Sequence, residues 1–146
     1  MAKKRFGKLA PRYLFALNPY SDARFSHCPE CSRLTYPRKF PLVIHLHGYG
    51  PFILGKTCRY CPKCEFIIAH QDELESVLAS MFSQRAPEVV GNEFFVLGTV
   101  QTKAWRKGIE DPSSLSDIRE HMADIKRYME VKHEPPRWVF TGETGV

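Results

Sequence analysis

The stretch Cys28-Pro29-Glu30-Cys31 recurs, with one internal change, as Cys61-Pro62-Lys63-Cys64, and 29 residues separate the two. Zn²⁺ prefers four ligands in a tetrahedron, and cysteine thiolates are among its best ligands. A Cys-X-X-Cys turn directs two sulfur atoms toward one metal, and proline after the first cysteine presets the backbone dihedral φ for that turn. The spacing therefore predicts one structural zinc ion, with Cys28, Cys31, Cys61 and Cys64 as its ligands.

The residues between the two cysteine pairs predict a β-hairpin. Residues 41–47 are apolar and β-branched enough to form a strand, residues 48–51 contain two glycines and a proline, and residues 52–60 form the return strand. Because the second pair follows the return strand directly, the hairpin is expected to bring the four thiols together.

Three other uses of the cysteines are possible in principle. Disulfides are disfavoured in a chain with no secretory signal. A redox Cys-Pro-X-Cys site needs a helix directly after it, whereas a β-rich run follows Cys64. An iron–sulfur cluster is a more serious rival because Cys58, Cys61 and Cys64 form Cys-X₂-Cys-X₂-Cys, although no fourth cysteine follows in ferredoxin spacing. Cys58 itself is expected to be a buried structural cysteine, with a substitute ligand or a reactive thiol as alternatives.

The two cysteine pairs and the hairpin between them resemble a zinc ribbon over residues 27–86. The second half, Tyr60 to Ile68 with the acid-capped helix after it, resembles the zinc-binding domain of certain bacterial antitoxins. The resemblance implies a structural role for zinc, held by the same four cysteines. The DNA-binding helix-turn-helix of those antitoxins has no counterpart here, so DNA binding does not follow. The whole chain also resembles bacterial proteins of this length, a likeness that implies no function.

The rest of the chain predicts an α+β fold in a single compact domain spanning residues 1–146. Its parts are a basic arm (1–26), the zinc ribbon with a helix (27–86), and a β-hairpin with a helix and tail (87–146). The first helix covers residues 72–84 and has Asp72 as its cap. The C-terminal hairpin pairs residues 93–102 with 103–109, and the second helix runs over residues 112–130. The apolar face of the first helix is expected to comprise Leu74, Val77, Leu78, Met81 and Phe82.

Charge is distributed unevenly along the chain. The first 40 residues hold nine Lys or Arg and two acids, whereas the rest of the chain is slightly acidic. A basic segment on a neutral body favours an anionic partner, so the preferred function is a binding module that contacts nucleic acid or a ribonucleoprotein. A solvated tail is the alternative. The residues expected to contact phosphates are Lys3, Lys4, Arg5, Lys8 and Arg12.

Two further functions remain open. The first is a protein–protein adaptor or self-association through a heptad-like seam on the second helix, formed by Leu115, Ile118, Met122, Ile125 and Met129. Packing of that seam against the chain's own sheet is the simpler alternative. The second is a small enzyme that uses Cys58 or the histidines at positions 27, 45, 47 and 70.

Residues 50–57 match the P-loop pattern Gly-X₄-Gly-Lys-Thr, but no nucleotide site is expected. The four middle residues are Pro, Phe, Ile and Leu, and a cysteine pair rather than a helix follows. No apolar run approaches the roughly 20 residues needed to cross a bilayer, so no membrane partner is expected. With neither a membrane span nor a signal sequence, we expect a cytoplasmic protein.

Overall fold

A computed structural model of the chain, described over residues 6–20, 22–110 and 118–131, is built on a closed six-stranded β-barrel. The strands are β1 (Leu9–Asn18), β2 (Tyr36–Leu46), β3 (Gly50–Cys61), β4 (Phe66–His70), β5 (Phe94–Val100) and β6 (Met122–Tyr128). Two α-helices, α1 (Gln71–Arg85) and α2 (Thr102–Glu110), and the 3-10 turns η1 (Pro87–Val89) and η3 (Ile118–His121) complete the described elements.

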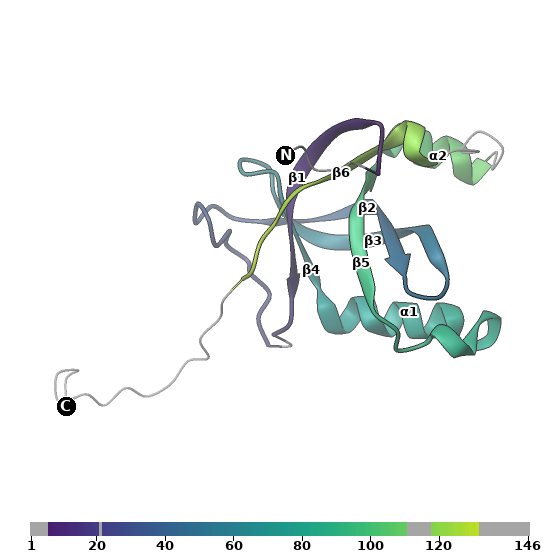
Figure 1. Cartoon of the computed structure of the whole chain (residues 1–146). Helices are drawn as coiled ribbons and strands as arrows, with labels where there is room; N and C mark the ends of the chain where they lie inside the picture. Colours follow the sequence, from purple (N-terminus) through teal and green to yellow (C-terminus); the bar gives the residue numbers. More distant parts are fainter. Residues whose placement is uncertain (1–5, 21, 111–117, 132–146) are drawn as a thin grey trace, which may run out of the picture.

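The order of strands around the barrel is β1-β4-β3-β2-β5-β6, and β6 pairs with β1 to close it. Strand β1 runs parallel to both of its neighbours, whereas the other pairs are antiparallel. Figure 1 shows β1 and β6, from opposite ends of the chain, lying side by side. The first strand is therefore held by hydrogen bonds to segments about 50 and 110 residues further along the sequence.

Side chains alternate between the inside and the outside of the barrel, as the pleat of a strand requires. The interior holds a cluster in which Tyr13, Phe40 and Tyr60 pack edge to face. Tyr13 lies on β1 with a φ of 72°, beside a register shift between β1 and β6. This irregularity turns a long aromatic side chain into the barrel interior.

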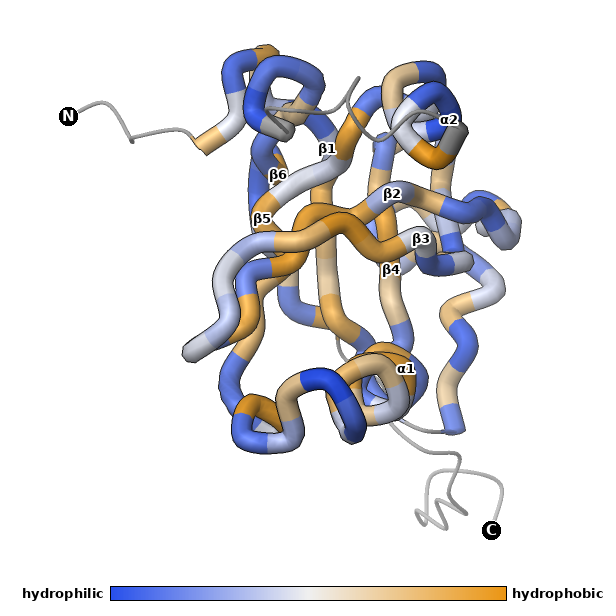
Figure 2. The backbone as a smooth tube through the Cα atoms, turned by 90° about the vertical axis from the view of Figure 1, so that its right-hand side faces the viewer, coloured by the Kyte–Doolittle hydropathy of each residue, from blue (hydrophilic) through white to orange (hydrophobic). Residues whose placement is uncertain are grey.

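The two α-helices lie on opposite sides of the barrel (Figures 1 and 2). Helix α1 buries Leu74, Leu78 and Phe82, and Leu78 and Phe82 pack against Leu46 of β2. Helix α2 contributes Trp105, which packs against a small cluster formed by Val43, Val100 and Met122 on the outer surface of the strands. Figure 2 shows hydrophobic residues concentrated along the strands and in α1. The barrel is thus apolar inside and on several outer patches.

The zinc-ribbon architecture predicted for residues 27–86 is wrong as a fold, although parts of it are present. Strands β2 and β3 form the predicted hairpin, and α1 matches the predicted first helix. Its cap is His70 rather than Asp72, and it makes no side-chain cap bond. The two strands of the hairpin belong to a closed barrel of six strands, because β2 also pairs with β5 and β3 also pairs with β4. The local pattern predicted the pairing of β2 with β3 but not the closure of the barrel.

The predicted C-terminal hairpin and second helix are also wrong. Strand β5 lies within the predicted strand over residues 93–102, but residues 102–110 form helix α2 instead of its hairpin partner. Residues 122–128 form β6, and residues 111–117 lie outside the described part of the chain. Met122 and Ile125 are buried and Met129 is half-buried, but they lie on a strand and the residue after it rather than on one face of a helix. These three residues accordingly contact three different clusters.

Within the basic arm predicted for residues 1–26, residues Leu9–Asn18 form β1, a strand in the barrel wall. Its residues Phe15 and Ala16 are buried, on the barrel interior and the outer surface respectively. Lys3, Lys4 and Arg5 lie outside the described residues. In the described part of the chain, none of the helices is long and apolar enough to cross a membrane.

Candidate metal centre

The sulfur atoms of Cys28, Cys31, Cys61 and Cys64 all lie within 4.8 Å of one another. The Cys31–Cys61 sulfur distance is 3.5 Å and the Cys28–Cys64 distance is 3.9 Å. Four sulfurs around a zinc ion with Zn–S bonds of about 2.3 Å would be about 3.8 Å apart. None of these thiols is in a disulfide. The predicted cysteines are therefore brought together in a set that can hold a metal ion.

The first cysteine pair lies in the connection between β1 and β2. Two backbone hydrogen bonds close the loop. The N–H of Cys28 donates to the Arg33 carbonyl at 2.7 Å, and the N–H of Ser32 donates to the Cys28 carbonyl at 2.8 Å. The backbone N–H of Glu30 donates to the Cys28 sulfur at 3.4 Å. Ser32, the residue directly after Cys31, has a φ of 65°. The chain thus reverses tightly around the two sulfurs.

The second pair forms the connection between β3 and β4. Cys61 is the last residue of β3 and is paired with Phe66, the first residue of β4. Glu65, directly after Cys64, has a φ of 51°. Both pairs are therefore followed by a residue in the left-handed region, although neither of these residues is glycine. The two motifs adopt similar turns despite their different positions in the barrel.

An apolar patch supports the four thiols on the outer surface of β1 and β4. Ala16 of β1 and Phe66 and Ile68 of β4 are buried in the same cluster as Cys28 and Cys61. Interior residues such as Phe15 and Ile67 alternate with them along the strands. Strands β1 and β4 are consequently buried on both faces, once by the barrel core and once by the cysteine cluster.

Burial and hydrogen bonding shift the thiol pKa values in different directions. The backbone N–H of Arg33 lowers the pKa of Cys31 to about 7 because it stabilises the thiolate. Burial raises the pKa of Cys64 to about 12 and also raises that of Cys28. In the metal-free protein, the protonated forms of Cys28 and Cys64 are therefore favoured over their thiolates. A cation is needed to stabilise four thiolates at this distance.

Cys58 is separate from the metal-ligand set. It is buried in the barrel interior at 4% exposure, and its sulfur lies 3.5 Å from the carbonyl of Lys56. Burial raises its pKa to about 12, so the thiol stays protonated at neutral pH. The expectation of a buried structural cysteine fits this position, and the Cys-X₂-Cys-X₂-Cys pattern does not converge on one metal.

The histidines at positions 27, 45, 47 and 70 are not part of the four-cysteine group. Among the described residues, the four-cysteine set is the only group of three or more potential ligands close enough to share a metal. His45 stacks on Phe95 with 6.3 Å between ring centroids, and His27 and His47 are exposed. His70 is the N-cap residue of α1. No described histidine therefore joins a metal site.

The two described basic residues predicted to bind nucleic acid are both ion-paired. Lys8 contacts Glu120 at 2.6 Å, and Arg12 contacts Glu65 at 2.9 Å. Both pairs are about half exposed, so each stabilises the fold only weakly. Their contact with phosphates stays a prediction, and a phosphate would have to compete with a carboxylate at each.

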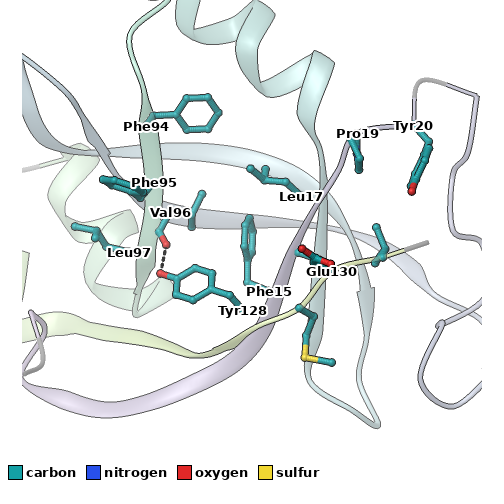
Figure 3. Close-up of a pocket in the computed structure, with 13 residues that line it drawn as sticks. Phe15, Leu17, Pro19, Tyr20, Phe94, Phe95, Val96, Leu97, Tyr128 and Glu130 are labelled. Atoms are coloured by element: carbon teal, nitrogen blue, oxygen red, sulfur yellow. Dashed lines mark hydrogen bonds between the residues drawn. The ribbon is translucent and has the colours of Figure 1, made fainter. Parts of the chain in front are cut away.

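An apolar pocket of about 720 Å³ opens where β5 diverges from β6. Figure 3 shows Phe15 of β1, Val96 of β5 and Tyr128 of β6 around it, and the Tyr128 hydroxyl donates to the Val96 carbonyl. Glu130 adds a carboxylate to the lining. The pocket is formed by three strands distant in sequence, which is why no motif indicated it.

Comparisons with protein-family models, with curated proteins and with solved structures gave no match to this chain. No family match therefore supports the zinc-ribbon resemblance, and the class supported by the geometry is a β-barrel with a four-cysteine cluster suited to a metal ion.

Proposed function

We propose that this chain is a binding module whose barrel is stabilised by one structural zinc ion. The observation that carries the proposal is the convergence of four cysteine sulfurs, within 4.8 Å, from two tight turns. Four sulfur ligands in a tetrahedral arrangement favour zinc or iron over harder cations such as Mg²⁺. All four positions are filled by protein, as in structural rather than catalytic zinc sites.

The role of the metal follows from what it joins. The connection between β1 and β2 has one isolated bridge, His27 with Leu34, and otherwise lies outside the strands. A metal ion would fasten it to the turn between β3 and β4, where Cys61 and Cys64 lie. Because the folded thiols are positioned by the barrel, the free energy of metal binding would add to that of folding.

Elemental analysis of the purified chain tests this proposal. One zinc per chain is expected, and Cys28→Ser and Cys64→Ser should each lose it and lower the melting temperature. Cys58→Ser is the matched control, because Cys58 lies in the barrel interior and should keep the metal. A protein that binds iron with visible absorbance, or that binds no metal at full stability, would contradict the proposal.

As partner we propose an anionic one, nucleic acid or a ribonucleoprotein. The support is the excess of Lys and Arg in the first 40 residues, among which Arg33 is exposed beside the first cysteine pair. Arg33 follows the first cysteine pair and Lys63 lies within the second, so the two turns each present a cation. We expect the purified chain to bind labelled RNA or DNA at low salt and to release it at high salt.

A further inference from the structure

A second, polar cavity of about 290 Å³ lies beside the start of α1. Its lining residues include Lys56, Thr57 and Arg59 of β3, together with Arg24, His70 and Glu73. Three permanent cations therefore surround one carboxylate. This composition differs sharply from the apolar pocket between β1, β5 and β6, whose lining holds a single charged residue, Glu130.

The cationic side chains are held in place by the fold. The Lys56 side chain is only 12% exposed, and its Nζ donates to the Thr57 carbonyl at 2.8 Å and to Glu73 at 2.9 Å. The Arg59 guanidinium donates to the hydroxyl of Thr35 at 3.0 Å and to its carbonyl at 2.9 Å. These anchored positions reduce the entropy cost of binding an anion.

The single carboxylate, Glu73, interacts with part of this positive charge and cannot neutralise all of it. The pKa of Glu73 is lowered chiefly by its hydrogen bond from Lys56, with smaller contributions from the charges of His70 and Arg24. Glu73 is 62% exposed on α1, so it can rotate away from the cavity. Among the described residues, Arg24 makes no hydrogen bond or ion pair through its guanidinium.

Two further features of the cavity point to an anion. Helix α1, 15 residues long, begins there with no side-chain cap at His70, so the positive end of its dipole faces the lining. The imidazole of His70 also lines the cavity and can donate a hydrogen bond to an anion there. A bound oxyanion would give these groups partners.

From this arrangement we propose that the cavity between β3 and the start of α1 binds the phosphate group of a small phosphomonoester. Arg24, Lys56 and Arg59 provide a net charge of about +2 against Glu73, which complements a phosphate dianion. The volume is near the lower limit for small-molecule pockets, which favours a compact ligand. The site is independent of the zinc centre and of the proposed nucleic-acid partner.

This site is not a P-loop. Residues 50–57 are part of the extended strand β3, so no backbone loop surrounds a phosphate. Lys56 and Thr57 reach the cavity as strand side chains, and the helix that begins there is α1, which follows β4 rather than β3. The expected ligand therefore carries one phosphate rather than a triphosphate chain.

Calorimetric titration of the zinc-loaded full chain with inorganic phosphate and with glycerol 3-phosphate, at constant ionic strength, tests the proposal. One saturable site per chain is expected for both. Arg24→Gln and Lys56→Gln should each weaken binding about tenfold, the usual effect of removing a charge-assisted hydrogen bond. Glu73→Gln should strengthen binding, because it removes the competing carboxylate. Arg106→Gln, on exposed α2, is the matched control and should bind as the wild type does.

Arg24→Gln should lower the affinity for phosphate and Glu73→Gln should raise it, so these two variants decide the test even if Lys56→Gln disturbs the fold. Arg24 and Glu73 are both exposed, and their substitution should therefore leave the circular dichroism spectrum unchanged. Absence of saturable binding for both phosphates would overturn the proposal. Affinity that is equal in the wild type, Arg24→Gln and Glu73→Gln would overturn it as well, because such binding would lie elsewhere on the basic surface.

Discussion

At the scale of single residues, five cysteines in one chain are divided between two environments by the pleat of β3. Cys61 faces the outer cluster with the other ligands, whereas Cys58, three residues earlier on the same strand, faces the barrel core. The side chains of a strand alternate, so an odd separation places these two thiols on opposite faces. The Cys61 sulfur therefore lies with the other candidate metal ligands, and the Cys58 sulfur is buried in the barrel core.

The buried Cys58 thiol should be unreactive in the folded protein. Burial raises its pKa to about 12, so almost no thiolate exists at pH 8. Mass mapping after iodoacetamide treatment should find Cys58 unlabelled in the native chain and labelled after denaturation. Rapid native labelling would contradict this and would favour the enzyme alternative.

The same shift makes stability depend on pH. An unfolded cysteine has a pKa of about 8.5. Because the folded value is higher, the contribution of Cys58 is fully present below about pH 8.5 and is lost as the pH rises toward 12. Cys58→Ala, compared with the wild type in urea unfolding, should reduce this loss on the alkaline side.

At the scale of elements, barrel closure depends on a close approach between β5 and β6. Gly98 is paired with Asp124, and a Cβ atom at position 98 would lie 2.1 Å from the Ala123 carbonyl oxygen. The neighbouring strand can give way only by moving its backbone. Gly55 of β3 is different, because a Cβ there would meet the Trp105 ring of α2 at 2.6 Å. That obstacle is a side chain.

Alanine substitutions at these two glycines should therefore differ in cost. Gly98→Ala is expected to destabilise the chain by about 3 kcal/mol or more, since it forces the two closing strands apart. Gly55→Ala should cost about 1–2 kcal/mol, because Trp105 can move away. Urea unfolding measures both, and Trp105 fluorescence should change in Gly55→Ala. Equal stabilities of the two variants would contradict this account of closure.

At the scale of the whole molecule, the basic first third is divided between the barrel and residues outside the described structure. Lys8 and Arg12 are ion-paired to Glu120 and Glu65 on distant parts of the chain. They lie at and within β1, which pairs with β6 and β4. Their replacement therefore tests folding as well as binding, whereas replacement of Lys3, Lys4 and Arg5 tests binding more directly.

Two variants separate these effects on nucleic-acid binding. Replacing Lys3, Lys4 and Arg5 with glutamine should weaken RNA or DNA binding, and each lost phosphate contact should reduce the slope of log affinity against log salt by about 0.7–0.9. Replacing Lys8 and Arg12 should in addition lower the melting temperature slightly, because two exposed ion pairs are removed. Filter binding over a salt series measures the slopes. Unchanged affinity and slope in both variants would exclude these five residues as the contact, and absence of binding by the wild type would exclude the proposed partner.

The local sequence determined the features that depend on neighbouring residues. The cysteine pairs predicted the four converging thiols, the Gly-rich turn at residues 48–51 predicted the β2–β3 hairpin, and the apolar spacing of residues 74–82 predicted α1. Each of these depends on a turn, a pleat or a helical repeat spanning a few residues. The physical information for them is contained within the segment itself.

Only the tertiary structure decided the barrel, the role of β1 and the two pockets. Strand β1 pairs in parallel with β4 and β6, and no turn joins it to either of them. Burial of β6 by several clusters gave it an apolar spacing that also fits a helix, and in the structure the pairing with β1 makes it a strand. The cations of the polar cavity, at positions 24, 56 and 59, meet only because the connection after β1 passes beside β3. Contacts between segments this distant in sequence arise from closure of the barrel, which no local pattern encodes.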